Sequence, residues 1–233
     1  MPSPAAIKYF DEIQKAEILR KVANDPRLKP VSRVEEGSSV KELMTLKWIL
    51  SILGVVSVKS LHVPDYPEKQ IYYHASLAAN VAAWDAYINN IVREFFNVTS
   101  DPSIPKFHAL HTVAKKIAEK ALKKFNTPNW ENTRNLLVQH TGYDPINDWI
   151  WSTHNMGVQQ VQERLNQILK VRHSFAHGFA IPAFSWTQSN AGVVRLTSLA
   201  LIENEAFFKN LVKQTDKGMK HYIDTIYGTN LTW

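Results

Sequence analysis

Twelve residues decide the interpretation of this sequence: Val171-Arg172-His173-Ser174-Phe175-Ala176-His177-Gly178-Phe179-Ala180-Ile181-Pro182. They combine an arginine, a histidine five positions later and an immediate glycine. Arginine is permanently cationic and grips a phosphate through two parallel hydrogen bonds, whereas the charge of histidine changes near neutral pH. Together these side chains are the minimum set of groups for phosphodiester chemistry without a metal. We therefore expect the chemistry of the protein to lie here.

The spacing of Arg172 and His177 raises a geometric difficulty. Five residues of an unbroken α-helix rotate by about 500°, which leaves the two side chains roughly 140° apart. Either the helix ends at His177, which Gly178 favours, or another element or a second subunit completes the site. His173 and His177, four residues apart, share a face.

Two other interpretations of these histidines compete with a catalytic one. A pair of histidines four residues apart can bind zinc, but Ser174 stands where a metalloprotease helix would carry its glutamate, so we expect no metal and no cofactor. His177 alone could be a structural histidine at a helix end. The spacing itself is weak support in a chain with nine histidines, and Arg134 with His140 makes a second match.

Composition narrows the class of protein. The chain of 233 residues contains no cysteine, which excludes disulfides, thiolate zinc sites and cysteine nucleophiles. Its start lacks a secretory pattern, and its most apolar run, residues 48–58, is too short to span a membrane, so we expect a cytoplasmic protein without membrane contact. A net charge of +6 favours polyanionic partners, RNA or DNA first, although a basic and indifferent surface remains the alternative.

Apolar periodicity predicts an all-α protein. The expected helices cover residues 5–24, 40–58, 68–96, 106–125, 128–141, 158–177 and 204–227, and residues 193–202 are expected to form a short strand or an irregular segment. Pro26 and Pro30 end the first helix, and residues 31–39 form a polar loop. Thr127 is expected to cap the helix that starts at Pro128.

The predicted helix over residues 106–125 has two distinct faces. Its apolar residues Leu110, Val113, Ile117 and Ala121 are expected to point inward. Lys116, Lys120 and Lys123 fall within roughly 60° of one another on the helical wheel. This lysine face is a candidate phosphate-contacting, and hence RNA-binding, surface, with a merely solvated face as the alternative.

The wider sequence decides between the two arginine and histidine pairs. Residues 172–178, RHSFAHG, resemble the Arg-polar-x-x-Ala-His-Gly signature of the HEPN superfamily, in particular its RiboL-PSP group. Residues 75–87, ASLAANVAAWDAY, resemble that family's long helix, in which the acid Asp85 precedes a small residue and an aromatic one. Residues 132–151 are similar to the segment before the catalytic helix, which makes Arg134 and His140 coincidental or supporting. The resemblance covers about residues 70–227.

The resemblance implies a HEPN-like helical bundle over residues 70–233, with residues 1–69 as an N-terminal helical extension packed on the core. It also implies a homodimer whose two motifs meet at a shared cleft and cleave RNA without a metal. The products are a 2′,3′-cyclic phosphate and a 5′-hydroxyl. Arg172 and His177 carry over as catalytic residues, and His173 fills a polar position with an orienting role, whereas Asp85 is not expected to be catalytic.

Members of this superfamily serve different ends. Many are toxins, phage-defence effectors or RNA-processing factors, so the resemblance leaves room for an antitoxin or another regulatory protein as a partner. Others have lost activity and act as modules that bind nucleic acid or protein. The sequence therefore predicts a ribonuclease, with an inactive binding module as the first alternative and a purely structural dimerisation protein as the second.

Overall fold

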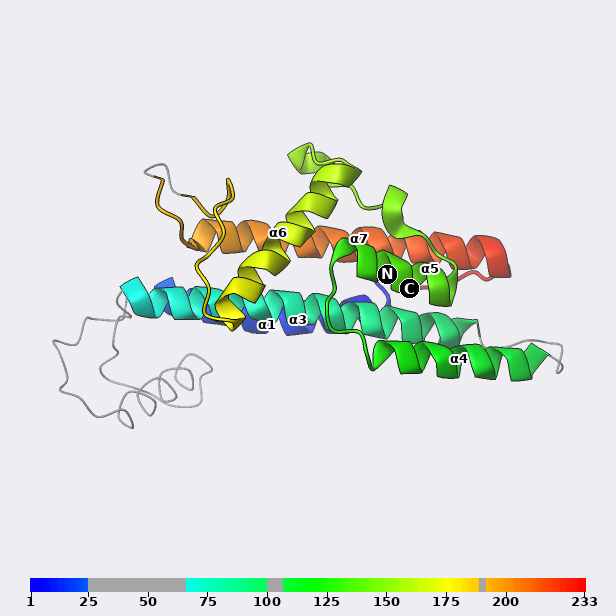
Figure 1. The fold of residues 1–233 in the computed structure, drawn as a ribbon. Helices are drawn as coiled ribbons and strands as arrows, with labels where there is room; N and C mark the ends of the chain where they lie inside the picture. Colours follow the sequence, from blue (N-terminus) through cyan, green and yellow to red (C-terminus); the bar gives the residue numbers. More distant parts are fainter. Residues whose placement is uncertain (25–65, 100–106, 189–191) are drawn as a thin grey trace, which may run out of the picture.

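The computed structural model describes residues 1–24, 66–99, 107–188 and 192–233, which form an all-α bundle (Figure 1). The helix predicted over residues 40–58 and the loop over residues 31–39 lie outside these ranges. The only β pairing in the described part of the chain consists of isolated bridges between Trp151 and Met156 and between Gln188 and Val194. The prediction of an all-α fold is therefore confirmed.

The helices follow the order of the predicted segments. They are α1 (Pro4–Asn24), α3 (Tyr66–Val98), α4 (His108–Leu122), α5 (Trp130–Thr141), α6 (Val158–Ala176) and α7 (Ser198–Tyr227), with the short 3-10 helices η2 (Pro145–Asn147) and η3 (Ser152–His154) between α5 and α6. None of the helices in the described ranges combines the length and the apolar character needed to cross a membrane.

The long helix α3 is the axis of the bundle. It contacts α1, α7, α4, α5 and α6. Figure 1 shows α1 and α7 running along it, α4 beside its second half, and α6 crossing it obliquely. Because it is covered on several sides, α3 is apolar over much of its surface. The largest fully buried side chains of the core are Trp84, Trp149, Tyr9, Tyr87, Phe207, Phe208, Ile13, Leu77, Ile88, Ile91, Leu137 and Leu165.

Helix α1 shares this core rather than forming one of its own. Tyr9 is fully buried and meets Tyr87 of α3 edge to face, with ring centroids 6.1 Å apart. The buried Ser3 hydroxyl accepts a hydrogen bond from the Ala6 backbone N–H, and Ser3 also binds the Asp216 carboxylate through its backbone N–H and its hydroxyl. The described part of the N-terminal segment is thus packed against α3 and α7, while a domain boundary between residues 69 and 70 stays a prediction.

Two predicted helix starts are wrong. Residues 198–202 are helical, because α7 begins at Ser198, where the Thr197 hydroxyl accepts a hydrogen bond from the Ala200 backbone N–H. Only residues 193–197 of the expected strand or irregular segment are non-helical. Helix α5 is capped by Asn129 and not by Thr127, since the Asn129 side chain accepts from the Asn132 N–H at 2.7 Å.

The predicted orientation of α4 is wrong for three of its four residues, since only Ala121 packs against the core. Leu110, Val113 and Ile117, which were expected to point inward, are 65 %, 54 % and 56 % exposed. The helix instead buries Ala118 and Leu122. Arg93 of α3 and Glu119 of α4 form a partly exposed ion pair between the two helices, with a nitrogen–oxygen distance of 3.0 Å. Periodicity located the helix correctly but could not decide which of its faces meets the core.

The segment before α6 is anchored to α7 by buried polar contacts. Trp149 is fully buried, and its indole N–H donates to the Thr215 hydroxyl at 2.9 Å. The Tyr143 hydroxyl donates to the Asp148 carboxylate at 2.7 Å, and both groups occupy the space where Gly218 of α7 has no side chain. A tryptophan buried with its N–H satisfied contributes its full apolar surface to the core.

We expect the Thr215→Val substitution to lower the free energy of unfolding by about 1–3 kcal/mol, because it keeps the shape of the side chain and leaves the buried Trp149 N–H without an acceptor. Urea denaturation followed by tryptophan fluorescence measures the change. Thr225→Val, at an exposed position of the same helix, is the control and should change stability by less than about 0.5 kcal/mol. Equal effects of the two substitutions would contradict the role of this hydrogen bond.

Candidate active site

Helix α6 ends in the pattern of hydrogen bonds known as a Schellman motif. The Gly178 N–H donates to the Phe175 carbonyl at 3.2 Å, and the Phe179 N–H donates to the Ser174 carbonyl at 2.7 Å. Gly178 has a φ of 69°, in the left-handed region that favours glycine. His177 is the C-cap residue, so the helix ends where Gly178 predicted.

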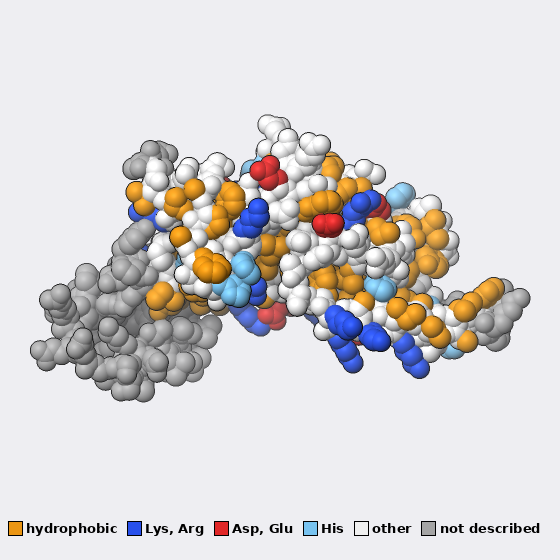
Figure 2. All heavy atoms as spheres, viewed as in Figure 1, with side chains coloured by type: hydrophobic (Ala, Val, Ile, Leu, Met, Phe, Trp, Pro, Cys, Tyr) orange, Lys and Arg blue, Asp and Glu red, His pale blue; other side chains and the backbone are white. Residues whose placement is uncertain are grey.

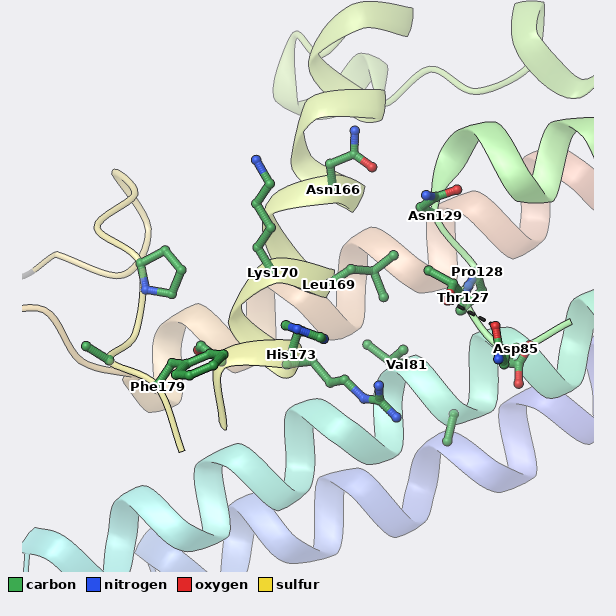
Figure 3. Close-up of a pocket in the computed structure, with 16 residues that line it drawn as sticks. Val81, Asp85, Thr127, Pro128, Asn129, Asn166, Leu169, Lys170, His173 and Phe179 are labelled. Carbon is green, nitrogen blue, oxygen red and sulfur yellow. Dashed lines mark hydrogen bonds between the residues drawn. The ribbon is translucent and has the colours of Figure 1, made fainter. Parts of the chain in front are cut away.

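A cavity of about 570 Å³ lies beside this helix end, between α3, α6 and the loop that joins α4 to α5 (Figure 3). Arg172 and His173 line it from α6, and Asp85 lines it from α3. Among the described residues, those that line the cavity do not include His177. The structure therefore brings Arg172 and His173 to one cavity and leaves His177 outside its lining.

Asp85 supplies the negative charge on the α3 side of the cavity. Its burial raises the pKa of the carboxyl group, whereas the nearby Arg172 guanidinium and a hydrogen bond from the Asn89 side chain lower it. The Asn89 amide lies 3.3 Å from the carboxylate. Arg172 lies close enough to Asp85 for the two opposite charges to attract each other.

The two histidines of the motif lie against each other. The ring centroids of His173 and His177 are 4.2 Å apart, as expected for residues four apart on a helix. Both side chains are exposed, and the ring of Phe179 lies 6.0 Å from that of His177. Both imidazoles are therefore accessible from solvent.

A buried histidine of α3 packs against the end of α6. His74 of α3 stacks on Phe175 with ring centroids 4.3 Å apart and an angle of 5° between the planes. Burial lowers the pKa of His74, because it disfavours the charged form of the ring. The stacked pair packs the last turn of α6 against α3, and this turn carries His173 and directly follows Arg172.

The competing pair Arg134 and His140 is placed differently. The Arg134 guanidinium donates two hydrogen bonds to the Asp144 carboxylate, at 2.8 and 2.6 Å. Such a bidentate ion pair occupies the donors that a phosphate would need. The hydrogen bonds close the loop after α5, which fits a supporting role for Arg134.

The three lysines predicted as a phosphate-contacting surface are exposed on α4. Lys116, Lys120 and Lys123 line a hollow of about 640 Å³ along this helix. Figure 2 shows Lys and Arg side chains along α4 and His side chains at the end of α6 on the same face of the molecule. The loop that follows α4 lines the cavity beside Arg172, so this loop connects the helix that carries the lysines to the cavity at the motif.

Several cavity residues were missed in the sequence. Asn166 and Lys170 line the cavity from α6, and Asn126 and Asn129 line it from the loop between α4 and α5. A signal for the first two existed, because positions 166, 170, 173 and 177 follow the spacing of one helical face. The loop residues carried no such signal, since only the tertiary fold brings them to α6.

The RiboL-PSP-HEPN family model matches residues 45–221, which is more than half of the chain. The chain belongs to the RiboL-PSP-HEPN family, as the resemblance in residues 172–178 and 75–87 predicted. The match begins at residue 45, inside the segment assigned to the N-terminal extension. Comparison with curated proteins and with solved structures gave no match.

We expect Gly178→Ala to lower the free energy of unfolding by about 1–2 kcal/mol, because an alanine pays the steric cost of left-handed backbone. An added Cβ meets nothing within 4 Å, so the cost is conformational and not a clash. Gly178→Asn should cost less, since asparagine tolerates this conformation. Chemical denaturation of both variants measures the difference, and equal costs for alanine and asparagine would contradict the assignment.

Proposed function

We propose that this protein is a metal-independent endoribonuclease that leaves 2′,3′-cyclic phosphate and 5′-hydroxyl ends. The observation that carries the proposal is the placement of Arg172 and His173 on a cavity, beside His177, at the end of α6 in a chain of the RiboL-PSP-HEPN family. The net charge of +6 adds general support, since it attracts a polyanionic substrate.

In this mechanism the 2′-hydroxyl of RNA attacks the adjacent phosphorus, and its proton passes to a histidine that acts as general base. The bond from phosphorus to the 5′-oxygen breaks, and a general acid returns a proton to this leaving oxygen. His177 exchanges protons with the substrate. Arg172 stabilises the negative charge that grows on the non-bridging oxygens, and His173 orients the phosphate or His177.

A homodimer would complete this site. The attacking and leaving oxygens lie on opposite sides of the phosphorus, so base and acid must approach from two directions. In one chain the rings of His173 and His177 are in contact, and His177 is not part of the cavity that Arg172 lines. In a homodimer, the α6 helix of the second copy would bring its own histidines to the other side of the phosphorus at a shared cleft.

The biological setting that fits such an activity is a cytoplasmic toxin or phage-defence effector, held in check by an antitoxin or another regulatory protein. RNA cleavage without a cofactor harms a host cell unless it is restrained. The proposal of this setting rests on the family, whose members include such effectors.

A catalytically inactive module that binds nucleic acid or a protein partner is the second candidate. It is favoured by the position of the two residues within a single chain, since Arg172 lines the cavity and His177 does not. It predicts binding of RNA without cleavage, and the two experiments below separate it from the ribonuclease.

The first experiment is cleavage of RNA in excess EDTA. We expect the wild-type protein to cut and to leave 2′,3′-cyclic phosphate ends, because arginine and histidine supply all the required charges and protons. His177→Ala should slow cleavage by roughly 10²–10⁴-fold, the contribution of a general acid or base. His140→Ala is the matched control and should cut at the wild-type rate. Loss of cutting in EDTA would sink the metal-free mechanism, and no cutting with intact binding would favour the inactive module.

The second experiment measures the salt dependence of RNA binding. Neutralising Lys116, Lys120 and Lys123 to glutamine should weaken binding and reduce the slope of log K against log[salt] by about 2, because each phosphate contact to a single strand contributes about 0.7. The control neutralises the exposed Lys8, Lys213 and Lys217, which changes the net charge equally. If both triple variants shift the slope alike, the lysines of α4 form only a solvated face.

A further inference from the structure

The cavity beside α6 has three kinds of wall. Lys170 and Arg172 give it a cationic side, and asparagine side chains give it an amide side. Its floor is apolar, with Val81 of α3 and Leu169 of α6 (Figure 3). Its volume of about 570 Å³ lies within the range of pockets that hold small molecules. The cationic side chains can contact the phosphate of a nucleotide, and an apolar slot lined with amides can hold its base.

The amide groups of the cavity keep hydrogen-bonding capacity for a ligand. The Asn129 carbonyl oxygen accepts from the Asn132 N–H, which leaves the two N–H donors of the same amide free to donate. The Asn126 carbonyl oxygen accepts from the Thr127 hydroxyl at 3.1 Å. Asn166, in the middle of the polar face of α6, points from the helix toward the cavity (Figure 3). Asparagine amides pair with the edges of unpaired bases.

An exposed aromatic ring stands at the mouth of the same cavity. Phe179 lines the cavity and is 66 % exposed, more than any other phenylalanine in the described chain. Its backbone N–H is held by the Ser174 carbonyl at 2.7 Å, so the ring is presented by a fixed turn and not by a loose loop. An exposed aromatic side chain on rigid backbone is a platform on which an unstacked base can lie.

We infer that this cavity binds one unpaired base of single-stranded RNA next to the phosphate that Arg172 holds. The base stacks on Phe179 at one end of the cavity, Lys170 contacts the adjoining phosphate, and the asparagine amides at the other end contact the neighbouring nucleotide (Figure 3). A base paired within a duplex cannot enter, because it would have to leave its stack and its partner. The inference rests on the proposed function in taking RNA as the ligand, and it adds selectivity for single strands.

Binding is measured with the His177→Ala protein, which does not consume the RNA, and a fluorescent single-stranded oligoribonucleotide. Phe179→Ala in this background should weaken binding by roughly ten-fold or more, and Phe179→Trp should retain it, because a larger ring still stacks. Asn166→Ala, which removes a half-buried side chain from the helix surface, should weaken binding several-fold. Leu199→Ala, which truncates a similarly exposed apolar residue on α7, is the control.

The second arm compares wild-type cleavage of one RNA as a single strand and annealed to its complement. We expect the single strand to be cut at least ten-fold faster. Equal cutting of both forms, or equal binding by Phe179→Ala and Leu199→Ala, overturns the base pocket and leaves the ribonuclease intact. Aromatic-dependent binding without any cleavage contradicts the ribonuclease and supports the pocket. Gel filtration accompanies each variant, and a loss of binding that follows only from a change in oligomeric state also overturns the pocket.

Discussion

The buried indole of Trp84 connects the core of this protein to its candidate site. Its ring lies among Trp149, Tyr87 and Phe208, and its N–H donates to the Pro128 carbonyl at 3.1 Å. A buried N–H without an acceptor is costly, so the loop between α4 and α5 is held against α3 at this point. The same loop forms one wall of the cavity, and Asp85, the next residue of α3, forms another. One hydrogen bond therefore joins the packing of the bundle to the shape of its cavity.

Much of the fold was accessible from the sequence, and the failures have physical causes. Helix positions followed from apolar periodicity and from stop signals such as Gly178, because these signals are local. The start of α7 was missed because Val193 and Val194 favour a strand, whereas a single hydroxyl, that of Thr197, decides where the helix begins. The predicted rotation of α4 was wrong because the face that meets the core carries Ala118 and Leu122, whereas Leu110, Val113 and Ile117 lie on an exposed face. A hydrophobic pattern predicts which face of a helix can be buried, whereas the elements packed around the helix determine which face is buried.

The candidate site also has a part that was predicted from the sequence and a part that was not. Arg172, His173 and His177 were found because they are close in the chain and resemble a family signature. The cavity wall from the loop between α4 and α5 lies more than thirty positions before the motif, and no spacing rule connects segments that meet only in the folded bundle. The resemblance also explains why Arg172/His177 was preferred to Arg134/His140. In the structure Arg134 donates two hydrogen bonds to Asp144, whereas among the described residues Arg172 donates no hydrogen bond to a carboxylate.

The end of α6 requires a left-handed backbone conformation at residue 178. A Cβ added at Gly178 meets nothing within 4 Å, yet the φ of 69° disfavours most L-residues. A D-amino acid has the mirror-image preference and would adopt this backbone without strain. Position 178 is therefore a place where backbone conformation, more than steric contact with neighbours, limits what the chain accepts. A D-alanine introduced there by chemical ligation would present His177 and Phe179 as glycine does, with less freedom to lose on folding.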